Sequence, residues 1–273
     1  MASNKPKLEG KVAIITGGAS GIGETTTRLF AAHGASVIIA DINDSLGHLI
    51  AASISPHGRC SFIHCDVRNE LHNAAAVAYA ITTYGRLDIM FSNAGIAGPM
   101  TGVLDLDPAD LDQTLAVHVR GTALAIKHAG RAMVAAGTRG SIICHASVSA
   151  ILGGFAPVAY MTAKHAILGL VKEAAAELGG KGVRVNCVSP YLVATPLVCG
   201  ATGADVAKVE KLLCTGAILK GAVLRADDVA TAVLFLASDD SAFISGHNLV
   251  IDGGATVVNT TLAKFIEGKY DLA

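Results

Sequence analysis

Three residues near the middle of the chain carry side chains that could move a proton. Tyr160 and Lys164 are four residues apart, and Ser147 precedes the tyrosine by thirteen residues. Residues at i and i+4 share one face of a helix, so the ammonium group can lie beside the phenol. A phenol ionises at about pH 10, and an adjacent cation favours the phenolate and lowers its pKa. The spacing predicts that Tyr160 is a general acid/base.

A glycine cluster near the N-terminus follows the first apolar run of the chain. Gly17, Gly21 and Gly23 have the spacing G-x-x-x-G-x-G, between a predicted strand and a predicted helix. Glycine lets the backbone approach a pyrophosphate closely, and a helix N-terminus favours its negative charge. Asp41 ends the next apolar run, where a carboxylate binds both ribose hydroxyls and repels a 2′-phosphate. We therefore expect NAD rather than NADP; the alternative is that Asp41 caps the following helix.

The elements that must position these residues alternate between short β-rich runs and longer alanine-rich runs. Strands are predicted over 12–16, 36–40, 61–65, 87–92, 141–146, 183–188 and 248–251. Helices are predicted over 22–33, 44–54, 69–83, 107–136, 158–178 and 226–237. This alternation is typical of an α/β fold with a doubly wound, Rossmann-type, parallel seven-stranded sheet and helices on both faces. We expect residues 1–273 to form a single domain, with a substrate lid over about 191–221.

The composition excludes several classes of protein. The net charge of −1 leaves no basic surface for nucleic acid or for an anionic membrane. The polar N-terminus lacks the apolar core of a signal peptide, and the six cysteines have no metal-ligand spacing. We expect a cytoplasmic protein with reduced thiols and no bound metal. Apolar residues make up 52% of the chain and charged residues 16%, which hints at surface hidden between subunits.

Several motifs in order resemble those of the short-chain dehydrogenase/reductase family over nearly the whole chain. They are the TGGASGIG run at 16–23, Asp66-Val67, Asn93-Ala94-Gly95, Ser147, Tyr160-x-x-x-Lys164 and the Val-Ser-Pro run at 188–190 that leads to Thr195. More loosely, the chain is similar to plant terpenoid dehydrogenases. Examples are isopiperitenol, borneol and secoisolariciresinol dehydrogenases, together with the nepetalactol-related dehydrogenases and cyclases of the mint family.

The resemblance assigns a role to each matching residue. Asp66 and Val67 would hold the adenine, and Val193 and Thr195 the nicotinamide amide. The residues that it implies for the cofactor are Gly17, Ser20, Gly21, Ile22, Gly23, Asp41, Asp66, Val67, Asn93, Ala94, Gly95, Tyr160, Lys164, Pro190, Val193 and Thr195. It also implies a homotetramer, with helices 107–136 and 158–178 at the subunit contacts.

In the implied reaction, Tyr160 as phenolate accepts the hydroxyl proton of an alcohol while hydride moves to the nicotinamide. Ser147 hydrogen-bonds the substrate oxygen, unless Ser149 takes that role. Lys164 lowers the pKa of the tyrosine and binds the nicotinamide ribose.

The chain departs from the family pattern at several positions. His118 replaces an asparagine that holds a relay water; its imidazole either continues that relay or is structural. His145 shares the strand face of Ser147, where it lines the substrate pocket or satisfies a buried hydrogen bond. Tyr191 replaces a glycine, and Ser92 replaces an asparagine. These changes affect the proton relay and the substrate pocket more than the cofactor site.

The segments expected to meet the substrate carry little charge. Segments 96–100 and 148–157 have none, and the four charges of 191–213 all lie in the predicted lid. We therefore expect NAD-dependent oxidation of a small hydrophobic, monoterpenoid alcohol or lactol. An alternative is a non-redox, NAD-bound terpenoid cyclase or isomerase of the nepetalactol cyclase type, for which His118 and His145 could supply a proton path. A catalytically idle NAD-binding protein is a third interpretation.

Overall fold

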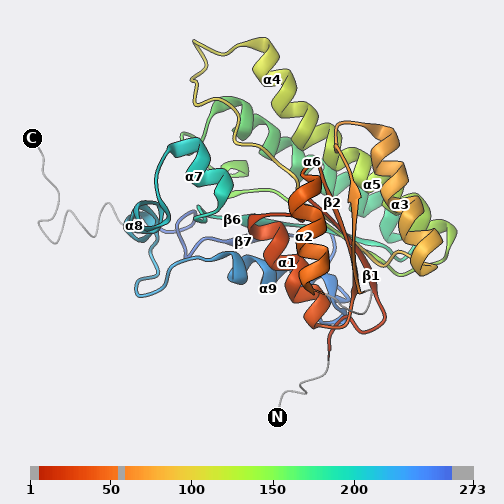
Figure 1. Cartoon of the computed structure of the whole chain (residues 1–273). Helices are drawn as coiled ribbons and strands as arrows, with labels where there is room; N and C mark the ends of the chain where they lie inside the picture. The colour runs from red at the N-terminus through yellow and green to blue at the C-terminus, as the bar shows by residue number, and fades with distance from the viewer. Residues whose placement is uncertain (1–5, 55–58, 260–273) are drawn as a thin grey trace, which may run out of the picture.

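The computed structural model describes residues 6–54 and 59–259, which fold around one parallel sheet (Figure 1). Its seven strands stand in the order β3-β2-β1-β4-β5-β6-β7, and every neighbouring pair is parallel. The strands are β1 (Val12–Thr16), β2 (Ser36–Asp41), β3 (Cys60–His64), β4 (Ile89–Ser92), β5 (Ser141–His145), β6 (Arg184–Pro190) and β7 (Asn248–Ile251). The predicted doubly wound sheet is confirmed, with boundaries shifted by a residue or two.

Helices cover both faces of this sheet because both faces of its strands are apolar. The helices are α1 (Gly21–Ala32), α2 (Asp44–Ile54), α3 (Glu70–Tyr84), α4 (Pro108–Leu115), α5 (Gly121–Ala135), α6 (Val158–Gly179), α7 (Pro196–Thr202), α8 (Val206–Gly216) and α9 (Ala226–Ala237). Alternate residues of β1 enter different cores: Ile14 packs with α3, α5 and α6, whereas Ile15 packs with α1, α2 and α9.

The helix predicted over 107–136 is confirmed as a continuous helical stretch over 108–135, but a π-helical turn interrupts its α-helical hydrogen bonding. Helix α4 ends at Leu115, the π-helical turn η1 (Ala116–Arg120) follows, and α5 begins at Gly121. A π turn inserts one residue into the helical ladder and rotates the side chains beyond it. Here the inserted turn carries His118, which is buried. The glycine that begins α5 sits against Val67, whose Cγ2 would lie 2.9 Å from a Cβ at Gly121.

The predicted lid segment contains two short helices. Helices α7 and α8 fill most of 191–221 and lie together at one end of the molecule (Figure 1). Asp205 caps α8 by accepting a hydrogen bond from the Lys208 amide at 2.8 Å. Among the described residues, no helix is both long and apolar enough to cross a bilayer.

Candidate active site

One cleft of about 590 Å³ opens at the carboxyl ends of the strands and gathers all the predicted site residues. This is where open α/β sheets bind ligands, at the point where the strand order reverses. Here β1 lies between β2 and β4, so the connections from β1 and β4 diverge to opposite faces. Residues from Gly17 to Thr195, far apart in the chain, therefore line the same cavity.

The glycine turn at one side of the cleft has the shape of a phosphate cradle. Gly17 has φ +63°, and a Cβ there would lie 2.8 Å from the Ala94 Cα. A Cβ at Gly23 would lie 2.0 Å from the Gly17 carbonyl oxygen. Asn93 Nδ2 donates to the carbonyl oxygens of Thr16 and Gly17 at 3.0 and 3.1 Å. No larger residue fits this turn, which directs the N-terminus of α1 into the cleft.

Asp41 holds the neighbouring loop rather than capping α2. Its Oδ2 accepts from the Ala19 amide at 3.0 Å, and its Oδ1 accepts from the Asn43 amide at 3.0 Å. The hydrogen bond at the start of α2 comes from Leu46 to Asn43 Oδ1 instead. The helix-cap alternative for Asp41 is therefore wrong. Its carboxylate lies in the cleft wall at the end of β2.

Ser147 and Tyr160 meet on the other side of the cleft. Ser147 follows β5, and its Oγ accepts from the Ser149 amide at 3.1 Å and donates to Ser149 Oγ at 3.2 Å. Tyr160 lies in the first turn of α6. Burial raises the pKa of its phenol to about 12. A hydrogen bond with Ser147 has the opposite, smaller effect and lowers this pKa. The two hydroxyls are thus within reach of one substrate oxygen.

Lys164 lies one turn further along α6 than Tyr160, on the same face of the helix. Its Nζ is 5.3 Å from the centre of the Tyr160 ring and donates to the His145 carbonyl oxygen at 2.6 Å. The side chain is almost fully buried, and burial lowers its pKa to about 7. Burial outweighs any effect of Lys164 here, so the Tyr160 pKa lies above its usual value and not below it as the sequence predicted. Both groups are desolvated, and the lysine carries only part of its charge near neutral pH.

Comparison with known proteins agrees with this geometry. A family model described as enoyl-(acyl carrier protein) reductase matches residues 17–256. A momilactone A synthase from Oryza sativa subsp. japonica is 50% identical over 97% of both chains. A secoisolariciresinol dehydrogenase from Forsythia intermedia is 47% identical, covering 95% of this chain and 94% of its own.

A solved short-chain type dehydrogenase/reductase from Mycobacterium marinum superposes with a TM-score of 0.85 and 32% identity, over 92% of this chain and 98% of its own. The chain belongs to the short-chain dehydrogenase/reductase family. The resemblance drawn from the motifs is confirmed, including its extension to plant dehydrogenases.

At the reaction centre, the clearest departure from the family pattern is His118, which replaces an asparagine. Its Nε2 lies 2.8 Å from the Ile96 carbonyl oxygen, and its ring meets the Tyr160 ring edge-to-face at 5.2 Å between centres. Burial, and secondarily the charge of Lys164, lowers its pKa to about 3. The imidazole is neutral, and its Nε2 lies 2.8 Å from the Ile96 carbonyl oxygen and 3.2 Å from the Ile96 amide nitrogen, so the Ile96 backbone holds Nε2 in either tautomer. The ring Nδ1 has no hydrogen-bond partner among the described residues.

His145 satisfies a buried hydrogen bond while bordering the cleft. Its Nδ1 lies 2.8 Å from Asn93 Oδ1, and its ring stacks on Phe91 with 6.1 Å between centres. Burial holds the pKa of this imidazole well below its usual value. The contact fixes the Asn93 side chain, which in turn supports the glycine turn. Both interpretations of His145 therefore describe part of its environment.

Tyr191 lines the cleft beside Phe155, which belongs to segment 148–157. Its ring lies 5.0 Å from that of Phe155, between centres. A Cβ at Gly216 would lie 2.2 Å from the Tyr191 hydroxyl, so this glycine leaves room for the phenol at the end of α8.

Arg68 and Gln113 also line the cleft and were missed. They are 45 residues apart in the chain and belong to no motif, so no sequence signal joins them.

Proposed function

We propose that this short-chain dehydrogenase/reductase oxidises a hydrophobic, terpenoid-type alcohol or lactol with NAD. The observation that carries the proposal is a single cleft holding Ser147, Tyr160 and Lys164 on one side and the glycine turn on the other. A hydroxyl pair beside a buried amine suits proton removal from an alcohol. The turn suits the pyrophosphate of a dinucleotide, because backbone amides and the N-terminus of α1 face it. The family as a whole consists of nicotinamide-dependent oxidoreductases.

NAD is favoured over NADP by the charge at the end of β2. The Asp41 carboxylate accepts two backbone N–H groups, which leaves lone pairs free for ribose hydroxyls. A 2′-phosphate at the same place would meet a fixed negative charge. No basic side chain among the described lining residues stands beside Asp41 to offset that charge, since the guanidinium of Arg68 is paired with Asp66.

The proton steps belong to the side chains. When bound, the oxidised nicotinamide supplies a hydride acceptor and a positive charge. Tyr160 accepts the substrate hydroxyl proton at its phenolic oxygen, and Ser147 holds the substrate oxygen by donating a hydrogen bond. Since burial raises the pKa of Tyr160 to about 12, the phenolate depends on nearby cations. Lys164, 5.3 Å from the ring centre, is the one that the protein supplies.

His118 acts in this scheme as a neutral positioning group. An imidazole with a pKa of about 3 does not store a proton as imidazolium near neutral pH. It fixes the Ile96 backbone at the cleft wall, and its Nδ1, which has no partner among the described residues, is open to one further hydrogen bond. The geometry supports this role more than that of a charged relay.

Apolar side chains surround the space beyond Tyr160. The residues that line it are Ile96, Met100, Phe155, Leu192, Val198 and Leu212. Among these described residues there is no cation to bind a carboxylate or phosphate. We therefore place a hydrophobic substrate there, with α7 and α8 as its lid. The name of the rice relative, momilactone A synthase, supports a lactol or related alcohol as the substrate class.

The test is NADH formation, followed by absorbance, with a panel of terpenoid alcohols and lactols. We expect turnover with part of the panel, and a loss of about 10²–10⁴-fold in Tyr160→Phe. The same panel with NADP should give much less product. Bound NAD with no NADH formed, but with a rearranged dialdehyde or enol product, would instead support the cyclase, which the relatives do not favour.

We further propose a homotetramer in the cytoplasm. In the tetramer, α4, α5 and α6 would contact partner helices, and the alanines and glycines of α5 and α6 would permit close approach. The six cysteines are free thiols, four of them buried, which suits a reducing compartment. Sedimentation at the mass of one 27.7 kDa chain would refute the tetramer.

A further inference from the structure

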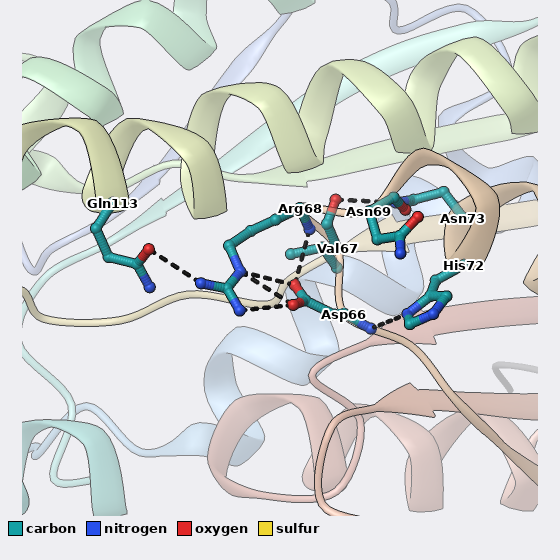
Figure 2. A network of polar contacts seen from close by, with 7 residues as sticks. All are labelled: Asp66, Val67, Arg68, Asn69, His72, Asn73 and Gln113. Atoms are coloured by element: carbon teal, nitrogen blue, oxygen red, sulfur yellow. Dashed lines mark hydrogen bonds and ion pairs between the residues drawn. The ribbon is translucent and has the colours of Figure 1, made fainter.

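One charged network of the cleft wall lies after β3, and its groups are paired with one another (Figure 2). Arg68 forms a two-pronged ion pair with Asp66: Nη2 lies 2.6 Å from Oδ2, and Nε lies 3.0 Å from Oδ1. Figure 2 shows the guanidinium extended toward α4, where Nη1 donates to Gln113 Oε1 at 3.0 Å. Three strands separate β3 from β5, which leads to Ser147. Selection among hydrophobic substrates must therefore come from groups nearer to Ser147.

Two serine hydroxyls lie next to each other at the reaction centre. Ser147 is followed by the 3₁₀ turn η2 (Val148–Ala150), in which the Ser149 amide donates to Ser147 Oγ at 3.1 Å. The Ala150 amide donates to the Ser147 carbonyl oxygen at 2.9 Å, which closes the turn. The two Oγ atoms are 3.2 Å apart. The backbone of this turn therefore fixes the spacing between the two hydroxyls.

This pair of serines has one more hydroxyl proton than it uses internally. A single contact joins the two oxygens and takes one O–H donor, the hydroxyl of Ser147. Among the described residues, the Ser149 hydroxyl donates to no acceptor. Ser149 is only 1% exposed, yet it belongs to the lining of the cleft. A buried donor without an acceptor is unfavourable, and an oxygen atom of a bound substrate would satisfy it.

We propose that Ser149 is a specificity-determining residue that selects a cyclic hemiacetal, a lactol, by donating a hydrogen bond to its ring oxygen. In a lactol the hydroxyl oxygen and the ring oxygen are bonded to the same carbon, so they are close neighbours, as the two serine hydroxyls are. In the bound state Ser147 donates to the hydroxyl oxygen and Ser149 to the ring oxygen. The Ser149 amide continues to hold Ser147 Oγ, because that contact uses the backbone.

The ring oxygen serves recognition and takes no part in bond breaking. In the oxidation, the hydroxyl O–H bond breaks and its proton goes to the phenolic oxygen of Tyr160. The C–H bond of the same carbon breaks and its hydride goes to the oxidised nicotinamide, so that the C–O single bond becomes a carbonyl. The product is a lactone, in which the ring oxygen keeps both of its bonds to carbon. A hydrogen bond to that oxygen is therefore present before and during the reaction, and it should affect KM more than kcat.

This inference rests on the proposed function, because it takes alcohol oxidation as the reaction. The experiment compares a monoterpenoid lactol with the carbocyclic alcohol in which CH₂ replaces the ring oxygen, and follows NADH absorbance. In Ser149→Ala, the preference for the lactol in kcat/KM should fall about five- to tenfold, the value of one neutral hydrogen bond. Most of the loss should be a higher KM for the lactol. The change in preference between the two proteins measures Ser149, because the intrinsic reactivity of each substrate cancels.

A binding measurement gives the same comparison without turnover. With NADH in place of NAD, neither substrate can be oxidised, so titration calorimetry reports Kd directly. The Kd of the lactol should rise about five- to tenfold in Ser149→Ala, and that of the carbocyclic alcohol should rise much less.

Two further variants separate the hydrogen bond from side-chain volume and from stability. Ser149→Cys introduces a larger side chain with a weak donor, so it should lose the preference as Ser149→Ala does, whereas an effect of volume would move the two variants in opposite directions. Ser141→Ala is the matched control: Ser141 is a buried serine at the other end of β5, outside the cleft lining, and its Oγ donates to the Leu236 carbonyl oxygen at 2.8 Å. It should leave the preference unchanged, even where it lowers stability.

The outcomes distinguish this proposal from the proposed function. If the unchanged protein forms no NADH with the lactol or with any alcohol, the proposed function fails. If it oxidises alcohols but Ser149→Ala or Ser149→Cys keeps the full preference for the lactol, the role of Ser149 is refuted while the dehydrogenase proposal stands. An equal loss of kcat for both substrates would also refute it, since Ser149 would then act through Ser147 on the substrate hydroxyl.

Discussion

Replacing His118 by asparagine should remove part of the acid sensitivity of the fold. The pKa of the buried imidazole is lowered from 6.5 to about 3 in the folded chain. Below pH 6.5 the unfolded chain therefore binds a proton that the folded chain does not. The stability that this ring contributes is fully present above pH 6.5 and is lost as the pH falls toward 3.

The size of the effect follows from the two pKa values. Each unit of pH between them costs about 1.4 kcal/mol, so lowering the pH from 8 to 5 should cost about 2 kcal/mol through this ring. The His118→Asn variant lacks that loss. Its stability relative to the unchanged protein should therefore rise by about 2 kcal/mol between pH 8 and pH 5, whatever the difference at pH 8.

Urea unfolding at pH 8, 7, 6 and 5, at one protein concentration, measures this difference. His145 is present in both proteins, so its own contribution cancels. His165→Asn, at an exposed position of α6, is the control for loss of any imidazole. A stability difference between His118→Asn and the unchanged protein that stays constant from pH 8 to pH 5 would refute a buried, neutral ring. The role assigned to Nε2 and Nδ1 would then fail with it.

Three other perturbations test different parts of the site. Lys164→Met should raise Tm most at and below pH 7, because burial lowers the pKa of the amine from 10.5 to about 7 and the unfolded chain is protonated there. The stability difference from the unchanged protein should narrow by about 3 kcal/mol between pH 7 and pH 9.5. Equal melting shifts at both pH values would contradict this. Gly95→Ala should destabilise the protein by about 1–3 kcal/mol in urea unfolding, since the added Cβ would lie 2.6 Å from His118 Cε1. Adding His118→Ala to the same chain should recover much of the lost stability. Gly216→Ala should displace Tyr191, whose hydroxyl would lie 2.2 Å from the added Cβ. This should raise KM for the hydrophobic substrate more than it lowers kcat. An unchanged KM would show that Tyr191 does not contribute to substrate binding.

The fold and the position of the cleft could be predicted from local patterns. Continuous apolar runs such as that of β2 are typical of strands covered on both faces, and alternation with helices leaves few topologies. The glycine turn was predictable because its function requires residues without a side chain at fixed spacing. Tyr160 and Lys164 were predictable because one helix carries both. In each case the residues that form the pattern belong to a single element or a single turn.

The properties that depend on packing between elements could not be predicted. The sequence predicted a lowered pKa for Tyr160, but burial raises it to about 12 and lowers that of Lys164 to about 7. The desolvation of a group depends on all the residues packed around it, and the i, i+4 spacing of Tyr160 and Lys164 does not indicate how deeply they are buried. The contacts of His118, which the π turn carries, likewise involve Gly95 and Ile96 from a different segment.

The sequence by itself determined the family, the sheet and the motif residues that face the cleft, because these follow from chain-local periodicity and motifs. Only the tertiary structure decided how the side chains are paired and charged there. Asp41 holds the glycine turn, His145 holds Asn93, and Arg68 bridges Asp66 to Gln113. Each of these contacts joins segments separated by at least 22 residues. Their energies depend on distance and burial in three dimensions, which residue spacing along the chain does not specify.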